Sequence, residues 1–171
     1  MIQTAARDRE IYILSYPSGT FKSHWALWIP RKHANLQSLP EQKKGPQGML
    51  IHVKGSLAAG FKHEFQRASY GPQSFERPWY KVLGRIREEH LTDGPTEGTD
   101  STAYNTVETL ALSIPAPGPS LNSAMSPASG LRPEIRDCQW WLKQLIDQLI
   151  QRQMLHPDAS KIVAETPIQW A

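Results

Sequence analysis

The sequence predicts an α+β fold in which an antiparallel β-sheet packs against one amphipathic helix. Two features favour this fold class. Short β-branched and aromatic runs of alternating polarity fill the first half of the 171-residue chain, and a strongly amphipathic helical stretch follows near its C-terminal end. A chain of this length can bury one hydrophobic core, so we expect residues 1–171 to form a single domain.

Five segments are candidate strands, because they combine β-branched or aromatic residues with turn residues at their ends. They are residues 11–16, 23–29, 48–54, 61–65 and 79–86. Residues 57–65 could instead be helical. The polar, turn-rich residues 31–46 are interpreted as a hairpin insertion, and residues 92–102 as a loop.

Two of these strands carry a histidine on a defined face. In residues 23–29 both alternating faces hold large apolar side chains, which is typical of a central strand covered on both sides. His24 shares one of these faces with Trp28. In residues 48–54, His52 lies on the face opposite the main aliphatic set. The two histidines meet if these strands pair in the matching register.

The amphipathic helix is the clearest single element. Pro133 and Glu134 suit a first helical turn, and Asp137 can cap or support this end. Apolar residues then recur at helical spacing and form one face, made of Cys138, Trp141, Leu142, Leu145, Ile146, Leu149 and Ile150. The sequence His156-Pro157-Asp158 ends the helix. We expect about three to four turns packed on the sheet.

Two segments between the strands and this helix leave alternatives open. Residues 104–112 fit either a short helix or a strand. Residues 113–132 are rich in Pro, Ser, Ala and Gly and predict a long loop. This loop could close over a binding site as a lid, or it could be a tolerated surface insertion.

Composition and charge exclude several classes of function. The formal net charge is only +3, and the basic residues are scattered rather than clustered as nucleic-acid binding requires. No apolar stretch is long enough to span a bilayer, and residues 1–10 lack the apolar core of a secretory signal. The single cysteine excludes an internal disulfide framework. We therefore expect a cytoplasmic protein with a free thiol, no nucleic-acid partner and no transmembrane segment.

Three residues carry the predicted chemistry: Cys138, His24 and His52. A cysteine at the start of a helix lies at the positive end of the helix dipole, which favours the thiolate. An imidazole can take the thiol proton and later deliver it to a leaving group, provided that a third polar group holds it in one tautomer. The helix N-terminus also offers N–H groups to a developing oxyanion. Together these residues supply the parts for covalent acyl transfer.

The order of these residues resembles a known family. His24-Trp25-Ala26-Leu27-Trp28-Ile29 looks like the histidine strand of the lecithin:retinol acyltransferase and phospholipase/acyltransferase family, a circularly permuted branch of the NlpC/P60 papain-like superfamily. Ile51-His52-Val53 resembles the second histidine strand of that family. Cys138 opens a helix where the family carries an Asn-Cys-Glu-His-Phe motif, with Asp137 in place of Asn and Gln139-Trp140 in place of Glu-His.

This resemblance implies a papain-like α+β domain with a Cys-His-His triad. Cys138 would be the nucleophile, His24 the general base and His52 the residue that orients His24. The residues expected to line the substrate groove are Tyr16, Trp25, Trp28 and Trp141. The tryptophans could equally fill the core, and His63 could be the third group if the register differs. No cofactor and no metal are expected, and zinc bound by the triad residues is a weaker alternative.

The leading functional hypothesis is a thiol hydrolase or acyltransferase that works through an acyl-enzyme. Its substrate would be the amide, ester or thioester of a small molecule, lipid or peptide. The missing hydrophobic tail of lipid-acting relatives disfavours phospholipids and retinyl esters. One alternative is a papain-like binding domain without activity, suggested by the altered residues around Cys138. Another is a small cyclase or condensing enzyme, with residues 113–132 as a lid.

Overall fold

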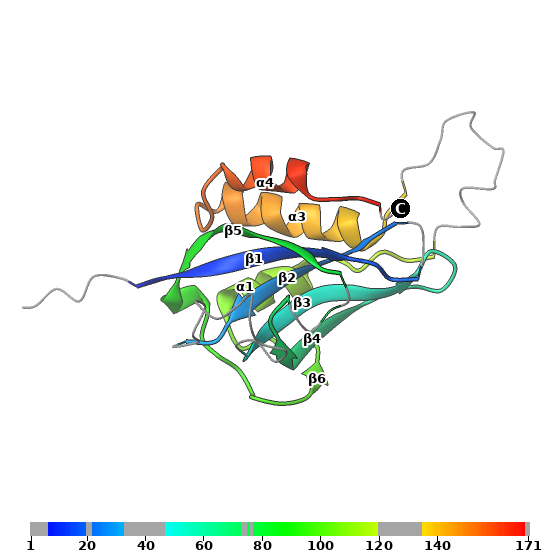
Figure 1. The fold of residues 1–171 in the computed structure, drawn as a ribbon. Coiled ribbons are helices and arrows are strands. Elements are labelled where there is room, and N and C mark those ends of the chain that lie inside the picture. Colours follow the sequence, from blue (N-terminus) through cyan, green and yellow to red (C-terminus); the bar gives the residue numbers. More distant parts are fainter. Residues whose placement is uncertain are drawn as a thin grey trace, which may run out of the picture.

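The protein has an α+β fold built on one six-stranded antiparallel sheet (Figure 1). The structure is a computed structural model that describes residues 7–19, 22–32, 47–72, 75, 77–119 and 135–169. Within these residues three α-helices accompany the sheet. The predicted fold class is confirmed at this level.

The sheet contains β1 (Asp8–Tyr16), β2 (His24–Pro30), β3 (Gln47–Ser56), β4 (Gly60–Tyr70), β5 (Trp79–Arg87) and β6 (Thr99–Asp100). The helices are α1 (Thr106–Ser113), α3 (Cys138–Gln151) and α4 (Ala159–Glu165), with a 3₁₀ turn η3 (Glu88–His90). All five predicted strands are present, and the segment around residues 57–65 contributes to a strand and not to a helix. Residues 104–112 lie mainly in α1, while the predicted loop at 92–102 contains the two-residue β6. Residues 33–46 of the predicted hairpin and 120–132 of the predicted loop lie outside the described residues.

β2 lies inside the sheet, as its two apolar faces predicted. The strand order is β5-β1-β2-β3-β4-β6, and every pair of neighbours is antiparallel. The register places Tyr16 opposite His24 and His52 opposite Glu64. Directly opposite residues of an antiparallel pair point to the same face, so each pairing brings two functional side chains together.

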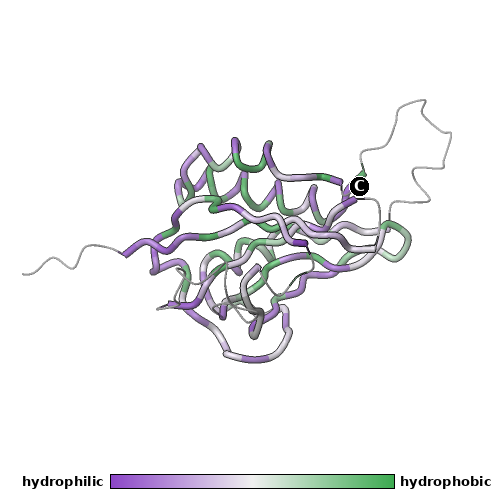
Figure 2. Tube along the Cα trace, in the orientation of Figure 1, coloured by the Kyte–Doolittle hydropathy of each residue, from purple (hydrophilic) through white to green (hydrophobic). Residues whose placement is uncertain are grey.

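The main hydrophobic core fills the space between the sheet and the helices. α3 and α4 cover one side of the sheet in Figure 1, and hydrophobic and hydrophilic residues alternate along both helices in Figure 2. The buried face of α3 matches the predicted one and includes Trp141, Leu142, Leu145, Ile146 and Leu149. Burying one large apolar side chain contributes about 1.5–3 kcal/mol. This face therefore anchors α3 on the sheet and fixes the position of its first turn.

α3 begins later than the sequence predicted. Its first residue is Cys138, because the side chain of Asp137 accepts a hydrogen bond of 3.0 Å from a backbone N–H of the first turn. Residues 135–136 are not helical, so the helix does not extend back toward Pro133 and Glu134, which lie outside the described residues. The predicted capping role of Asp137 is confirmed. The cysteine consequently occupies the very start of the helix.

α3 also ends before the predicted stop at His156-Pro157-Asp158. The N–H groups of Gln153 and Met154 donate to the carbonyls of Ile150 and Leu149, at 3.0 and 2.9 Å. Gln153 has a φ of 59°, so this is a left-handed helix end of the Schellman type. The following helix, α4, was missed because it is short and buries a single residue.

A buried arginine ties β4 to β6 and α1. Arg67 is 1% exposed, and its guanidinium hydrogen-bonds Asp100 and the fully buried Glu108 at 2.7–3.1 Å. Burial alone would lower the pKa of Arg67, but its hydrogen bonds with Asp100 and Glu108 outweigh this effect and raise it. The guanidinium therefore stays charged and holds α1 and β6 against β4.

The C-terminal segment joins the start of β2 to the start of α3. The carbonyl of Pro167 accepts hydrogen bonds from the Ser23 hydroxyl and the Trp25 indole, at 2.7 and 2.8 Å. The Gln139 amide donates to the carbonyls of Ser23 and Ile168, at 2.9 and 3.0 Å. These buried hydrogen bonds hold the first residues of β2 and α3 in a fixed relation.

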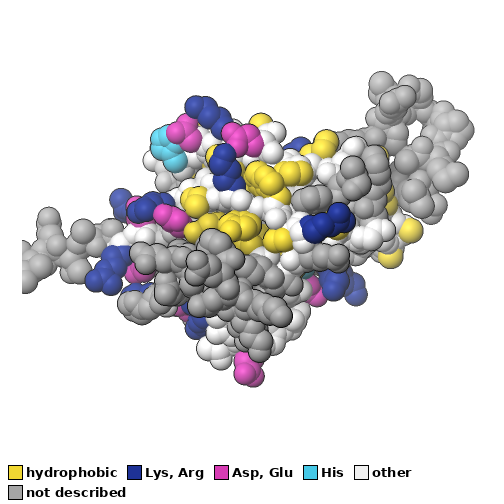
Figure 3. Space-filling view, in the orientation of Figure 1, with side chains coloured by type: hydrophobic (Ala, Val, Ile, Leu, Met, Phe, Trp, Pro, Cys, Tyr) yellow, Lys and Arg dark blue, Asp and Glu magenta, His cyan; other side chains and the backbone are white. Residues whose placement is uncertain are grey.

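The described surface carries charges of both signs. In the space-filling view, Lys and Arg side chains lie interspersed with Asp and Glu on the face shown (Figure 3). This pattern agrees with the scattered basic residues of the sequence. Among the described helices, none combines the length and the apolar character that crossing a membrane requires.

Candidate active site

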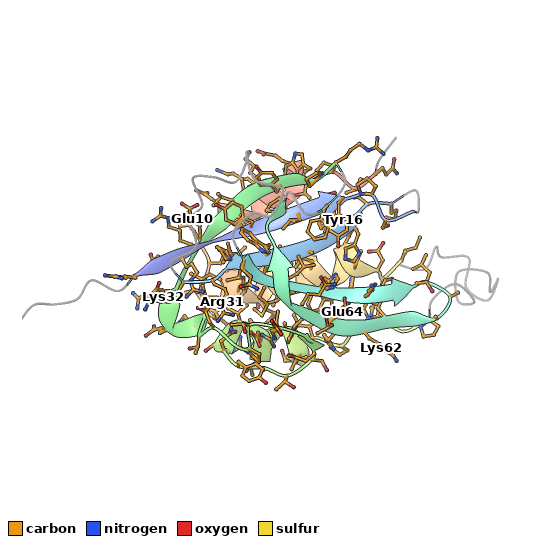
Figure 4. All side chains as sticks on the ribbon, turned by 60° about the horizontal axis from the view of Figure 1, so that its bottom comes forward. Glu10, Tyr16, Arg31, Lys32, Lys62 and Glu64 are labelled. Carbon is orange, nitrogen blue, oxygen red and sulfur yellow. The ribbon has the colours of Figure 1, made fainter. Side chains whose placement is uncertain are left out.

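Four side chains form a row across neighbouring strands. Tyr16 on β1 lies opposite His24 on β2, with ring centroids 5.1 Å apart. Nε2 of His24 lies 2.7 Å from Nδ1 of His52 on β3. Nε2 of His52 in turn lies 2.7 Å from Oε2 of Glu64 on β4. Figure 4 labels the two ends of this row, Tyr16 and Glu64. The predicted approach of His52 to His24 is confirmed.

Hydrogen bonding fixes the positions of the protons in the row. An ionised Glu64 is only an acceptor, so Nε2 of His52 carries the proton and donates it. In a neutral ring Nδ1 of His52 is then an acceptor, and Nε2 of His24 must donate to it. The basic nitrogen of His24 is therefore Nδ1, which has no hydrogen-bond partner among the described residues.

The charges of the row follow from burial and from Glu64. Burial alone would raise the pKa of Glu64, but hydrogen bonds from Gln66, at 2.9 Å, and from His52 lower it. Burial lowers the pKa of His52 although Glu64 opposes this effect. Burial also lowers the pKa of His24 to about 3, with a further lowering from His52 and Lys54. At neutral pH the row therefore contains one carboxylate and two neutral imidazoles.

The Cys138 thiol lies at the first residue of α3 and is 8% exposed. The largest influence on it is burial, which raises the pKa of the thiol to about 11. Backbone N–H groups of Trp25 and Gln139 hydrogen-bond the sulfur and favour its ionised form. Within the described residues, no hydrogen bond joins this sulfur to either imidazole. The resting thiol is thus protonated, and its sulfur is directed at backbone amides.

An ion pair lies next to the thiol. Asp137 raises the pKa of Cys138, whereas Lys22 lowers it. The ammonium of Lys22 donates to the carboxylate of Asp137 at 2.5 Å. Lys22 therefore offsets part of the repulsion that a lone Asp137 would exert on a thiolate.

One cavity of about 710 Å³ contains the thiol and the histidine row. Its size is that of a typical small-molecule site. Cys138, His24 and His52 all line it, so the structure brings the three predicted residues to one place. Its other walls include the apolar Leu57, Phe61 and Phe75 and the basic Lys22 and Lys54, together with Asp137 and uncharged polar residues.

Tyr16 lines this cavity, as predicted. Its ring stacks on Phe75, with centroids 4.3 Å apart and an interplanar angle of 19°. Burial raises the pKa of Tyr16, and the nearby Cys138 and Glu64 raise it further. Its hydroxyl therefore stays protonated and can act as a hydrogen-bond donor at this site.

The three tryptophans predicted to line the groove are packing residues instead. Trp25, Trp28 and Trp141 are at most 1% exposed and are absent from the cavity wall. The indole N–H of Trp25 donates to Pro167, and that of Trp141 donates to Ile114. Trp25 and Trp141 fill the main core, whereas Trp28 packs in a second cluster with Tyr12, Leu14, Ala26 and Leu50. The groove-lining prediction is therefore wrong for all three, because their large rings are fully enclosed by apolar neighbours.

His63, the alternative third group of the site, contacts the Ile114 carbonyl and not the histidine row. Nε2 of His63 lies 2.7 Å from the Ile114 carbonyl, and its ring packs edge-on against Trp141 in the main core. His63 is therefore not the third member of the row. Within the described part of the chain, no group of three His, Cys, Asp or Glu residues is arranged to bind a metal ion.

Sequence reasoning did not identify Glu64, Gln66, Lys22 or Lys54 as site residues. The alternation in residues 61–65 predicted a polar face through Glu64. Only the register of β3 on β4, however, shows that this face meets His52. Strand pairing between segments is not encoded in either segment alone.

Residues 11–156 match the model of a family of unknown function, DUF6540, and the chain belongs to this family. The match covers the whole of α3 and all of the strands, apart from the first residues of β1. No curated protein and no solved structure matches the chain.

Proposed function

We propose that this protein is a cysteine-dependent hydrolase or acyltransferase with a papain-like arrangement of Cys138, His24 and His52. The observation that carries the proposal is the row Glu64–His52–His24, which leaves a single basic nitrogen in a cavity shared with the thiol. Such an ordered row is what a general base requires. The substrate is an ester, thioester or amide.

In the proposed reaction, the sulfur of Cys138 bonds to the substrate carbonyl carbon while its proton passes to Nδ1 of His24. This step requires the sulfur to move from the backbone amides toward the imidazole within the cavity that both residues line. The carbonyl π electrons move to oxygen and then return as the bond to the leaving group breaks. His24 gives its proton to that group. A water or another acceptor, deprotonated by His24, then bonds to the acyl carbon of the thioester. The carbon–sulfur bond breaks, and His24 returns the proton to the sulfur of Cys138.

Neighbouring groups favour both charges that form in this step, the imidazolium of His24 and the thiolate of Cys138. Glu64 raises the pKa of His24 and of His52, and it therefore favours the imidazolium that forms. The N–H groups of Trp25 and Gln139 and the ammonium of Lys22 favour the thiolate. With the sulfur turned toward His24, the same amides are available to a developing oxyanion.

The experiment is pre-steady-state hydrolysis of 4-nitrophenyl esters, followed by release of 4-nitrophenolate. We expect an initial burst of one equivalent for the native protein and none for Cys138→Ala. His24→Ala should lose at least about a hundredfold in the burst rate, since general-base catalysis contributes roughly 10²–10⁴-fold. His156→Ala, an exposed histidine variant, is the matched control and should retain the burst. A native protein without a burst on any activated ester would overturn the proposal.

A second candidate is a binding domain that retains this cavity without turnover. Burial keeps both the thiol and His24 neutral, and this favours a site that binds ligands without chemistry. Under this alternative, a ligand found by screening would bind Cys138→Ala and the native protein equally. No covalent adduct would form on the native protein.

A further inference from the structure

Two lysines face each other directly beside the thiol cavity, and one of them, Lys54, lines it. Lys54 on β3 and Lys62 on β4 are register partners in the antiparallel pair, so their side chains project from the same face. This is also the face of His52 and Glu64, two residues further along each strand. Figure 4 labels Lys62 next to Glu64 on β4.

The pairing of these lysines costs stability unless an anion accompanies them. Like charges directly opposite each other on neighbouring strands are destabilising. Both side chains are exposed, and neither has an ion pair or side-chain hydrogen bond within the described residues. By contrast Lys22, the other lysine of the cavity, is paired with Asp137.

The face beside the cavity carries a net positive charge next to an apolar surface, because Lys54 and Lys62 together exceed the single carboxylate of Glu64. Lys54 lines the cavity, and the other charged groups among its described lining residues are the paired Lys22 and Asp137. Leu57, Phe61 and Phe75 provide apolar walls. The carboxylate of Glu64 accepts hydrogen bonds from His52 and Gln66 and interacts electrostatically with Lys54, which leaves the charge of Lys62 without a counterpart on this face.

We infer that the substrate of this site carries an anionic group, a carboxylate or a phosphate, which Lys54 binds with Lys62 beside it. This inference rests on the proposed function and names the substrate class for it. An ammonium is a suitable point charge for either anion, and a charge-assisted hydrogen bond is about twice as strong as a neutral one. The apolar walls hold the remainder of the acyl compound.

An anion at this position would also assist the proposed chemistry. Lys54 lowers the pKa of both His24 and His52. A substrate anion on Lys54 would cancel part of this effect and make His24 a better base once the substrate is bound. The positive charge of Lys54 thus links recognition of the substrate to activation of the base.

The test compares 4-nitrophenyl esters of one length that differ only in the terminal group: carboxylate, phosphonate, neutral amide or ammonium. We expect kcat/KM to be at least about tenfold higher for one of the two anionic esters than for the neutral ester, and lowest for the ammonium ester. Lys54→Gln should remove this preference, so that kcat/KM for the anionic esters falls to the value for the neutral ester in the same variant. Lys62→Gln should reduce the preference in part. The carboxylate and phosphonate arms show which anion the site prefers.

Lys161→Gln is the control, because Lys161 is an exposed lysine on α4 away from the cavity wall. It should leave the preference unchanged. Equal kcat/KM for anionic and neutral esters, or an equal loss for both in Lys54→Gln, would overturn the inference while leaving the proposed function intact.

Binding of the free glutarate and glutaramate ions to Cys138→Ala separates the two claims. Tighter binding of the dianion that depends on Lys54, without any turnover by the native protein, would contradict the proposed function and support the anion site. Equal binding of both compounds would contradict the anion site.

Discussion

The carboxylate of Glu64 and the imidazole of His52 lie opposite each other on β4 and β3, with 2.7 Å between Oε2 and Nε2. This single contact determines which nitrogen of each imidazole carries a proton. Through His52 it leaves Nδ1 of His24 as the basic atom of the site. In the proposed reaction Glu64 would be a positioning residue, since it contacts the reacting groups only through two imidazoles.

Glu64→Ala should lower kcat/KM by about 10–100-fold, the usual effect of removing a partner that orients an active imidazole. Glu64→Gln should lower it less, because the amide oxygen can still accept from His52. Nitrogen NMR should show a mixture of His24 tautomers in Glu64→Ala and one tautomer in the native protein. Glu165→Gln, at an exposed carboxylate on α4, is the control. Unchanged tautomers in Glu64→Ala would contradict this assignment.

Stability should fall as the pH drops below about 6.5, the ordinary pKa of histidine, toward about 3. In this range the unfolded chain binds a proton at His24 that the folded protein excludes, so the free energy of unfolding decreases with acid. One such histidine contributes up to about 1.4 kcal/mol per pH unit. Urea unfolding across this range should give a shallower pH dependence for His24→Gln than for the native protein. An identical pH dependence in His24→Gln and the native protein would exclude a buried neutral His24. His156→Gln, at an exposed histidine, is the control and should show the native pH dependence.

Asp137→Asn should accelerate alkylation of Cys138 by iodoacetamide at neutral pH several-fold. The substitution removes a carboxylate that raises the thiol pKa and leaves in place Lys22, which lowers that pKa. Asparagine caps helices as well as aspartate does, so the free energy of unfolding should change by less than about 1 kcal/mol. Asp147→Asn, on the same helix, should not alter the rate. A slower reaction in Asp137→Asn would show that the carboxylate is not the dominant charge at the thiol.

In the native protein the alkylation rate should rise with pH up to about 11, the pKa to which burial raises the Cys138 thiol. The thiolate is the reactive form, so each pH unit below this value should reduce the rate by about tenfold. Ultraviolet absorbance of the thiolate gives an independent titration. A plateau already reached at neutral pH would contradict a buried protonated thiol.

Arg67→Met should destabilise the protein by about 3–5 kcal/mol, because it leaves the fully buried Glu108 without its cation. Chemical denaturation gives the free energy of unfolding for the variant and the native protein. Arg87→Met is the matched control, since Arg87 is 66% exposed, and it should change stability by less than about 0.5 kcal/mol. A small loss in Arg67→Met would mean that the buried network is replaceable by apolar packing.

The sequence predicted the elements of this fold better than their contacts. Alternation in residues 23–29 was sufficient to predict a strand inside the sheet, and helical spacing was sufficient to predict the apolar face of α3. Both patterns repeat over several residues, which makes them readable from the sequence alone. The start of α3 was misplaced, since Pro133 and Glu134 suit a first turn as well as the cap at Asp137 does. Local preference could not decide between them.

For the candidate site, residue type and chain order were sufficient to bring His24, His52 and Cys138 together in one prediction. They could not reveal Glu64, because its role depends on which residue of β3 it faces. They also assigned Trp25 and Trp28 to the groove, although both rings are fully buried, one in the main core and the other in the second cluster. The contact of the Cys138 sulfur with the backbone N–H of Trp25 likewise depends on how α3 packs against β2, which local sequence does not determine.

The central claim is that His24 enables Cys138 to accept an acyl group. Intact-mass spectrometry after brief exposure to activated esters and thioesters tests it most directly, with peptide mapping to locate any adduct. The account predicts a single hydroxylamine-sensitive acyl group on Cys138 that forms rapidly in the native protein, slowly in His24→Ala and not in Cys138→Ala. Adducts on other residues only, or equal rates in the native protein and His24→Ala, would contradict it.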